Sequence, residues 1–466
     1  MRTIFFDIDC LRPDHLGCYG YNRPTSPNID TVAKQGVRFD RYYCSDSPCL
    51  PSRMNWSSGR FGIRNGVVSN TGVGAQFHIR TRSYVGPQPD NDMLMRRLRR
   101  VKLQPVSFSN FADRHNMFWF ECGWAEFHTP NLKGGGEVAP EIHEPLMRWL
   151  KQNAKREDYL LHINYWDAHR LYKMDASWAD RFKDYPVTQP WPDEDAIKRQ
   201  QSMKGPFTAQ AQFKDGKSVV PLMPGSISSR KDFEHMITGY DASIAYVDHH
   251  LGIVMNELAS QGVLDDTAII ITSDHGDSFG EHGIYSDHVN ADECIHHIPL
   301  IIKWPALRAS TGLSMAQGAT EKGRVCDSML YNIDFSPTLC ELFGAEVPAD
   351  WDGVSFAPQV RGEKGKERER LVWGHALYTV QRAVRTKTHL MIRTYDDFNY
   401  PHDEIELYDM VKDPYQARNI AKEHEDIVCE CNDYVINHWL EEQKSKPHWP
   451  GDPFDAVLAE RKARKG

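Results

Sequence analysis

Apolar and polar positions along the chain predict alternating strands and helices. Three apolar runs of strand length, each ending in or followed by an aspartate, are residues 3–9, 158–166 and 267–273. Residues 233–262 carry apolar side chains at helical spacing and lead directly into the third run. A shorter helix is predicted at 27–36, with proline at its start and glycine at its end. This alternation predicts an α/β fold built on a large, doubly wound, mostly parallel sheet.

Polar side chains follow these strands where each strand ends. They are Asp9, Asp167, His169, Asp274 and His275. The carboxyl ends of parallel strands meet at one edge of such a sheet, and reactive groups gather beyond that edge. Five polar side chains at strand ends are difficult to explain as core residues, so we expect a functional site there.

The C-terminal part of the chain has a different pattern. Residues 362–370 are a charged stretch that reads as an exposed linker. Short strand-like segments follow at 371–373, 382–385, 389–393 and 406–409, and a final helix is predicted around 421–442. We therefore predict a catalytic α/β domain over 1–362 and a smaller α+β domain over 363–466.

Composition narrows the range of functions. The 466-residue chain has a formal net charge of −9, which argues against nucleic acid as a partner. Its longest apolar runs, at 268–272 and 299–302, are far shorter than a membrane span. The first residues lack the pattern of a secretory signal, which favours a cytoplasmic location. The ten cysteines have no disulfide spacing, and Cys429 and Cys431 are expected to be free thiols.

The most specific motif surrounds Cys49. Residues 49–53 read Cys-Leu-Pro-Ser-Arg, and Ser58-Gly59-Arg60 follows. Here the chain resembles the type I sulfatases of the alkaline-phosphatase-like superfamily, in which this cysteine is oxidised to formylglycine by a maturation enzyme. The resemblance implies that one hydroxyl of the hydrated aldehyde, ionised by a metal, attacks sulfur. The other hydroxyl then expels sulfate by re-forming the aldehyde. Arg53 is expected to hold the formylglycine oxygens, or to serve the maturation enzyme as a recognition signal.

The same resemblance implies a divalent metal held by Asp9, Cys49, Asp274 and His275. Calcium is the ion usual in the family. This sequence has Cys10 where many members carry a second aspartate, so Mn²⁺, Mg²⁺ and Zn²⁺ stay open as alternatives. Asp7 either compensates for the missing ligand or is a buried, hydrogen-bonded carboxylate.

Further roles follow from position in the family pattern. His169 aligns with a histidine that contacts the sulfate, and His288 aligns with a lysine that binds sulfate and protonates the leaving alcohol. Arg114 and His115 are the nearest counterparts of a missing Gly-Lys-Trp-His segment, with a packing role as the alternative. His282 is interpreted as structural. For His296 and His297, a place in the substrate pocket and a surface position are both open.

These observations support a sulfatase that acts on a small anionic substrate, most simply a sulfated saccharide. The closest rival is a phosphonate monoester or phosphodiester hydrolase of the same superfamily. A third hypothesis is a protein that binds sulfate but has lost catalysis. Such a protein would be expected to have lost active-site residues, yet Asp9, Cys49, Arg53, Asp274 and His275 are all present. A homo-oligomer stays open.

Overall fold

A mixed eight-stranded sheet forms the centre of the molecule in the computed structural model, which describes residues 1–77, 93–134, 136–305, 323–446, 449 and 451–465. In sheet order its strands are β12 (Arg324–Cys326), β2 (Val37–Phe39), β11 (Leu300–Lys303), β8 (Thr267–Thr272), β1 (Arg2–Ile8), β7 (Tyr159–Tyr165), β5 (Gln104–Phe108) and β6 (Glu126–His128). The run from β8 to β6 is parallel, as the sequence predicts. Strand β11 is antiparallel to both its neighbours, which the sequence pattern does not reveal.

Helices cover both faces of this sheet, so the doubly wound prediction is confirmed. Helices α1 (Pro27–Lys34), α6 (Ala139–Asn153) and α8 (Arg230–Ser260) pack on one face. Helices α2 (Cys49–Ser58), α4 (Leu94–Arg100) and α10 (Phe335–Phe343) pack on the other. Strand β1 serves both cores, because Ile4, Phe6 and Ile8 point to the first face and Phe5 to the second.

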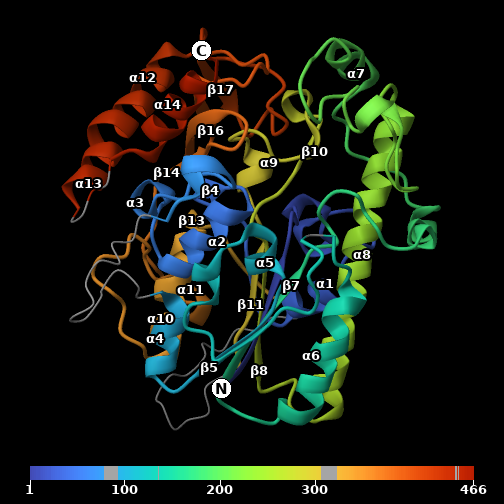
Figure 1. Cartoon of the computed structure of the whole chain (residues 1–466), viewed down its shortest axis with the longest axis vertical. Helices are drawn as coiled ribbons and strands as arrows, with labels where there is room; N and C mark the ends of the chain where they lie inside the picture. The colour runs from blue at the N-terminus through green and yellow to red at the C-terminus, as the bar shows by residue number, and fades with distance from the viewer. Residues whose placement is uncertain (78–92, 135, 306–322, 447–448, 450, 466) are drawn as a thin grey trace.

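Helix α8 starts earlier than its apolar pattern suggests. The Ser229 hydroxyl accepts a hydrogen bond from the Asp232 backbone N–H and so caps the helix three residues before Asp232. The helix is 31 residues long. In Figure 1 it runs beside α6 along one side of the central strands.

A second, five-stranded sheet lies at one end of the molecule. Its order is β17 (Ile405–Asp409), β16 (His389–Asp396), β15 (Val380–Thr386), β14 (Arg370–His375) and β4 (Asp46–Ser47). The predicted C-terminal strands are thus present. Edge strand β4, however, comes from the N-terminal part of the chain and pairs in parallel with β14. The proposed division at 362/363 stays a prediction, and this sheet uses residues from both sides of it.

The predicted final helix is several pieces. Helix α12 (Glu425–Asp433), a π-helical segment (Tyr434–Trp439) and α13 (Leu440–Ser445) follow one another. A further helix, α14 (Pro453–Lys465), was not predicted. All three α-helices gather around the smaller sheet in Figure 1. The apolar residues Phe454 and Val457 of α14 pack against Val380 of β15.

Shorter elements include β3 (Tyr42–Tyr43), β9 (Ser278–Phe279), β10 (Tyr285–Asp287), β13 (Leu330–Tyr331), α3 (Gly62–Asn65), α5 (Phe111–His115), α7 (Glu194–Gln200), α9 (Glu293–His296), α11 (Ala357–Arg361) and the 3-10 helices η6 (Ala176–Phe182) and η8 (Glu281–Gly283). Within the ranges given above, no helix has both the length and the apolar run that crossing a membrane requires.

Candidate active site and metal centre

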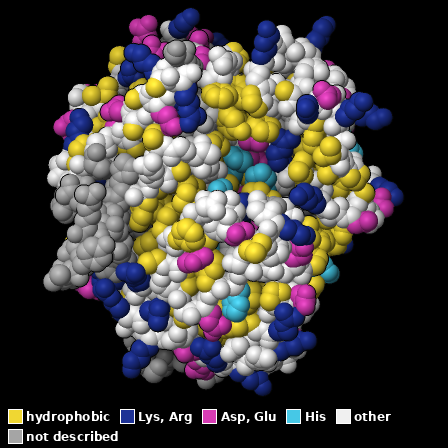
Figure 2. Space-filling model, in the orientation of Figure 1, with side chains coloured by type: hydrophobic (Ala, Val, Ile, Leu, Met, Phe, Trp, Pro, Cys, Tyr) yellow, Lys and Arg dark blue, Asp and Glu magenta, His cyan; other side chains and the backbone are white. Residues whose placement is uncertain are grey.

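Four of the predicted site residues come together at the carboxyl edge of the large sheet. Asp9 follows β1, Asp274 and His275 follow β8, and Cys49 is the first residue of α2. All four are buried, and their potential ligand atoms lie within 4.8 Å of one another. Figure 2 shows histidine side chains at the bottom of a hollow near the centre of one face, with Lys or Arg side chains beside it. The structure therefore brings together the group that the sequence proposes as a metal site.

Cys49 faces this group with its sulfur. Its Sγ lies 3.1 Å from Nε2 of His275. Burial, together with the neighbouring carboxylates Asp9 and Asp274, raises the pKa of the Cys49 thiol well above its ordinary value. An unmodified Cys49 is therefore a protonated, weak nucleophile at neutral pH. Its chemistry must come from modification or from a cation.

Arg53 lies one turn further along α2 and is fully buried. It donates from Nε to Asp7 Oδ2 at 2.7 Å and from Nη1 to Asp274 Oδ2 at 2.6 Å, and Nη1 lies 3.1 Å from Asp9 Oδ2. Its donors thus serve carboxylates, whereas the resemblance implies that they hold the modified Cys49. Asp7 is bonded to Arg53 and to His162, and it belongs to none of the potential ligand groups among the described residues. Asp7 is therefore the buried, hydrogen-bonded carboxylate of the two alternatives.

Cys10 occupies the place of the missing aspartate and faces the same space. Its backbone has φ +58°, which turns the thiol toward Asp9 Oδ1 at 3.4 Å and His275 Nδ1 at 3.8 Å. With His275, Asp277 and His288 it forms a second group of potential ligands that overlaps the first. Sequence reasoning missed Asp277, although its spacing three residues after Asp274 is a usable signal.

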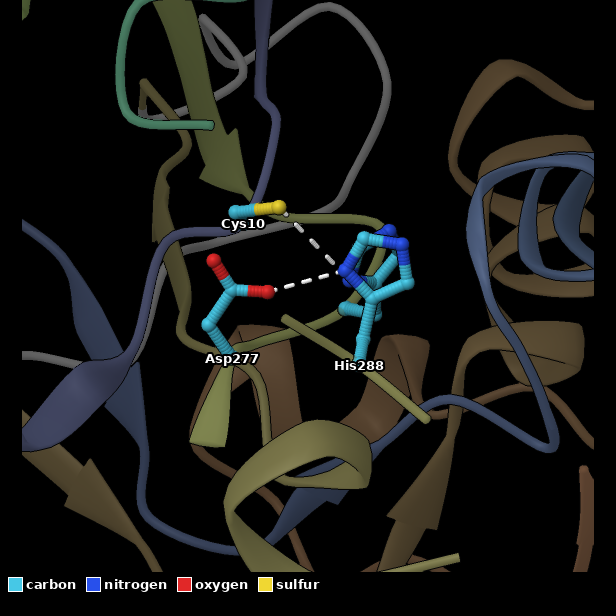
Figure 3. A group of neighbouring side chains, drawn as sticks. Cys10, Asp277 and His288 are labelled. Carbon is cyan, nitrogen blue, oxygen red and sulfur yellow. Dashed lines mark hydrogen bonds and ion pairs between the residues drawn. The ribbon is translucent and has the colours of Figure 1, made fainter. Parts of the chain in front are cut away.

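His288 is held by that aspartate. Its Nδ1–H donates to Asp277 Oδ1 at 2.9 Å, and Figure 3 shows the two side chains directed toward each other beside Cys10. Burial and the nearby His275 act to lower the pKa of His288, but Asp287 and the hydrogen bond to Asp277 outweigh them and raise it. The predicted cation at this position is thus supported electrostatically.

His169 lies on the other side of His288. The two ring centroids are 5.5 Å apart, and the His169 ring stacks on Trp166 at 3.9 Å. Burial, followed by His288 and His275, lowers the pKa of His169 well below its ordinary value, so this imidazole is neutral. Asp167, in contrast, points away: its carboxylate accepts a hydrogen bond from the Ala139 backbone at the start of α6.

Arg114 reaches the same edge from α5. Its guanidinium lies 3.5 Å over the Trp166 ring, and Nη1 lies 3.8 Å from Asp9 Oδ2. Two of its buried nitrogens, Nε and Nη1, have no hydrogen-bond acceptor. His115 packs on Phe111 with a centroid distance of 4.8 Å. Burial, then Arg114 and Arg53, lowers the pKa of His115 to about 2, so it contributes no charge.

Several other histidines have structural partners. His296 contacts the Cys44 carbonyl oxygen at 2.9 Å through Nδ1 and stacks on Trp373, and His297 contacts the Asp40 carbonyl oxygen at 2.9 Å. Both histidines therefore stabilise the fold through contacts with backbone oxygens. From the sequence, only a substrate-pocket or a surface position is expected for them. His375, at the end of β14, was also missed; its Nδ1 lies 2.8 Å from the Ser47 hydroxyl.

The donor set suits a divalent cation. Asp9 Oδ2 is buried and accepts no hydrogen bond, although Arg53 Nη1 lies 3.1 Å away, and Asp9 and Asp274 add negative charge in a closed space. The Nδ1–H of His275 donates to the Gly276 carbonyl oxygen at 2.8 Å, which directs the Nε2 lone pair toward the carboxylates. Metal-binding histidines are commonly oriented in this way. Carboxylate oxygens with an imidazole nitrogen are ligands of many divalent ions.

Comparisons with known proteins agree with this geometry. The sequence model of the sulfatase family matches residues 3–345, and the model described as N-sulphoglucosamine sulphohydrolase, C-terminal, matches residues 280–438. The chain is 25% identical to an N-acetylglucosamine-6-O-sulfatase of Bacteroides thetaiotaomicron, over 90% of this chain and 82% of that protein. It is 23% identical to a choline-sulfatase of Rhizobium meliloti, over 94% and 85% of the two chains.

Solved structures share the fold. One, a complex with its substrate D-glucosamine-2-N,6-O-disulfate, aligns with a TM-score of 0.73 at 20% identity, over 96% of this chain and 99% of the other. A phosphonate monoester hydrolase of Agrobacterium radiobacter aligns with a TM-score of 0.69 at 19% identity, over 94% and 95% of the two chains. The family model covers most of the chain, and the residues that carry the resemblance meet in one buried group. This chain belongs to the sulfatase family.

Proposed function

We propose that this protein hydrolyses sulfate esters of a small saccharide at the Cys49 site, after a maturation enzyme has converted Cys49 to formylglycine. One observation carries the proposal. Cys49, inside its Cys-x-Pro-Ser-Arg motif, begins a helix that faces Asp9, Asp274 and His275 at ligand distance. Two relatives support the saccharide: the glucosamine sulfatase named above and a Δ4,5-hexuronate-2-O-sulfatase of Bacteroides thetaiotaomicron, 25% identical over 90% of this chain.

The metal would be held by Asp9, Asp274 and His275, together with the modified residue 49. When bound, it supplies Lewis-acid stabilisation of negative charge on the reacting oxygens. The resemblance favours calcium. Cys10 leaves the site with one carboxylate fewer than is usual, which keeps Mn²⁺, Mg²⁺ and Zn²⁺ open, and the His275 imidazole suits Zn²⁺ in particular. Arg53 neutralises Asp7 and part of Asp274, which keeps these buried carboxylates compatible with one another.

Three side chains are placed to handle the sulfate and the leaving group. His288, whose pKa is raised by Asp287 and by the hydrogen bond to Asp277, offers Nε2–H to a sulfate oxygen and then to the leaving alcohol. Arg114 offers the anion two buried nitrogens that donate no hydrogen bond. The neutral imidazole of His169 is available to accept a proton when the sulfated residue 49 breaks down.

Two observations support the alternative hypothesis that the protein is a phosphonate monoester or phosphodiester hydrolase. A hydrolase of that class shares the fold over nearly the whole chain. The second aspartate of the usual sulfatase site is replaced here by Cys10. A phosphate diester carries one charge, like a sulfate monoester, so the cations of this site do not separate the two substrates.

The test combines peptide mass spectrometry of the fragment that carries Cys49 with hydrolysis of paired aryl sulfate and aryl phosphodiester substrates. The protein is produced with and without a formylglycine-forming enzyme, and Cys49→Ala and Cys18→Ser serve as the inactive variant and its control. We expect thiol-to-aldehyde conversion and dominant sulfate release, both lost in Cys49→Ala alone. Dominant phosphodiester turnover would transfer the assignment to the rival. Full activity with an unmodified Cys49 would overturn the mechanism.

A further inference from the structure

Another group of potential metal ligands, His282, His402 and Glu406, shares no residue with the groups around Cys49 and Cys10. His282 belongs to η8, which follows β9, whereas His402 precedes β17 and Glu406 lies on that strand. Their potential ligand atoms lie within 4.8 Å of one another, and none of the three belongs to the groups around Cys49. The side chains of His282, His402 and Glu406 are 11%, 1% and 6% exposed. Because these side chains are buried, the cluster differs from the exposed groups of acidic residues that are common on protein surfaces.

The inner ring nitrogens converge on one carboxylate. Nδ1 of His402 lies 3.1 Å from Glu406 Oε2, and Nε2 of His282 lies 3.8 Å from Glu406 Oε1. The two imidazole centroids are 5.0 Å apart with an interplanar angle of 52°. The rings are thus inclined to each other, with one nitrogen of each ring beside the same pair of oxygens.

The outer ring nitrogens lie next to side-chain oxygens. Nδ1 of His282 lies 3.0 Å from Asp292 Oδ1, and Nε2 of His402 lies 3.1 Å from Asn290 Oδ1. Metal-binding histidines almost always donate their second N–H to a carboxylate or a carbonyl, which fixes the tautomer and leaves the other nitrogen as a lone pair. His402 has that arrangement, and in His282 the outer nitrogen lies close to a carboxylate without an aligned hydrogen bond, while the inner nitrogen of each ring faces Glu406.

The cluster also requires positive charge. Asp292 is fully buried, and its Oδ1 and Nδ1 of His282 lack a well-aligned hydrogen bond although they lie close together. Two buried carboxylates, Asp292 and Glu406, are balanced either by two protonated imidazoles or by one divalent ion with both imidazoles neutral. A divalent ion satisfies the same charge and also uses the inward lone pairs.

We propose that His282, His402 and Glu406 bind a divalent metal of the zinc class, with a water or the Tyr408 hydroxyl as fourth ligand. The Tyr408 hydroxyl lies 2.7 Å from Nε2 of His282, next to the three ligands. Two imidazoles and one carboxylate form a ligand set typical of Zn²⁺, whereas Ca²⁺ and Mg²⁺ prefer oxygen ligands alone. The proposal stands independently of the chemistry at Cys49.

This ion would connect the two sheets. His282, Asn290 and Asp292 lie on the segment that follows β8 of the large sheet, and the same segment carries His288. His402 and Glu406 belong to the smaller sheet and the loop before it. A bound ion therefore adds a cross-link between the sheets and restrains the segment from which His288 reaches the active site.

The test uses the full-length protein and zinc alone as the probe. Asp274→Asn serves as the background, to weaken binding at the Cys49 site. After removal of metals with a chelator, zinc is added back, unbound ion is removed, and zinc per chain and Tm are measured. We expect one zinc per chain and a zinc-dependent rise in Tm. Adding His402→Gln or Glu406→Gln should weaken zinc binding at least ~100-fold. Adding His389→Gln, a matched control on β16 outside the cluster, should leave it unchanged.

A second measurement covers the case in which the variants fold poorly. X-ray absorption of the zinc-loaded Asp274→Asn protein should show two imidazoles and only nitrogen or oxygen ligands, at about 2.0–2.2 Å. A sulfur ligand would place the ion beside Cys10 or Cys49 and overturn the proposal. So would the absence of zinc from Asp274→Asn, or unchanged zinc affinity in correctly folded His402→Gln and Glu406→Gln.

Discussion

Oxygen acceptors decide how the active-site imidazoles are presented. Nδ1 of His275 is held by the Gly276 carbonyl oxygen at 2.8 Å, and Nδ1 of His288 by Asp277 at 2.9 Å. In both residues Nε2 is therefore the nitrogen that faces the reaction centre. A neutral carbonyl orients His275 without fixing a proton on Nε2, whereas the carboxylate of Asp277 stabilises a charged His288. The same type of side chain is thus suited to bind a metal at one position and to act as an acid at the other.

The first prediction concerns Asp277→Asn. The pKa of His288 is raised, because Asp287 and the hydrogen bond to Asp277 outweigh burial and His275, so His288 keeps its charge to higher pH than an ordinary histidine. Loss of the carboxylate lowers that pKa, and the alkaline fall of kcat/KM should move to lower pH. A pH profile with an aryl sulfate measures the shift.

Two variants of His288 complete that experiment. His288→Lys should move the alkaline fall to higher pH, because lysine keeps its charge longer. His288→Ala should reduce kcat/KM by roughly 10²–10⁴-fold. An alkaline limb that stays in place in Asp277→Asn would show that His288 is not the titrating acid.

The second prediction concerns Arg53, which is buried among three carboxylates. Arg53→Gln leaves these charges without their cation and should reduce the free energy of unfolding of the metal-free protein by about 3–5 kcal/mol. Added metal should recover part of the loss. Urea unfolding with and without chelator measures both effects. Arg148→Gln, an exposed ion-pair control, should cost less than ~0.5 kcal/mol. Equal costs for the two variants would contradict the buried-charge argument.

At the level of elements, a short strand and a helix together place Cys49. Strand β4 pairs with β14 of the smaller sheet, and α2 begins two residues later. Asp46 of β4 joins this segment to the next turn, because its carboxylate accepts hydrogen bonds from the Gly62 backbone at 2.8 Å and the Asn55 side chain at 2.7 Å. Burial, only partly offset by these bonds, raises the pKa of Asp46 to about 7.

The third prediction follows from that pKa. The folded protein keeps a proton on Asp46 that the unfolded chain releases near pH 4, so this stabilising contribution is complete below pH ~4 and is lost as pH rises through about 7. Asp46→Asn does not titrate. Its unfolding free energy relative to wild type should therefore rise by about 2–3 kcal/mol between pH 5 and pH 8.

Urea unfolding at the two pH values provides the measurement. Asp180→Asn, on an exposed 3-10 helix, is the control, and its difference from wild type should change by less than ~0.5 kcal/mol. A difference between Asp46→Asn and wild type that is independent of pH would show that Asp46 titrates normally in the folded protein.

At the scale of the whole molecule, helix α14 links the segment after β14 to the loop that precedes the active site in space. Arg461 of α14 donates to the carbonyl oxygens of Ala376, Leu377 and Tyr378, at 3.2, 3.0 and 2.6 Å. Glu460 of the same helix accepts a hydrogen bond from the Val73 backbone. This contact reaches the loop of Asn70, whose side chain accepts a hydrogen bond from the Leu50 backbone, next to Cys49.

The fourth prediction tests this link. Arg461→Ala removes a partly buried, charged donor from three carbonyl oxygens and should reduce the free energy of unfolding by about 2–4 kcal/mol. Arg464→Ala, an exposed neighbour that pairs with Glu460, should cost less than ~0.5 kcal/mol. Urea unfolding measures both. Similar small costs would mean that α14 contributes little to the stability of the whole chain.

Local pattern was sufficient for much of the fold and for the residue types of the site. The central strands and α8 could be predicted because burial repeats along the chain with the period of each element. Asp9, Cys49, Asp274 and His275 could be placed together because strand ends meet at one sheet edge and a specific motif identifies Cys49. The strand-end residues need only local pattern and the rules of sheet topology, whereas Cys49 was added to them through the resemblance to the sulfatase family.

The tertiary structure decided everything that depends on contacts between distant segments. Strand β4 joins a sheet made mostly of residues more than 300 positions later, and no period in the sequence indicates this pairing. Asp277 contacts His288, and Arg53 balances Asp7, only because separate segments of the chain meet in a buried space where charges act strongly on one another. The sequence thus determined which chemistry is available, and the fold determined which atom faces which and with what charge.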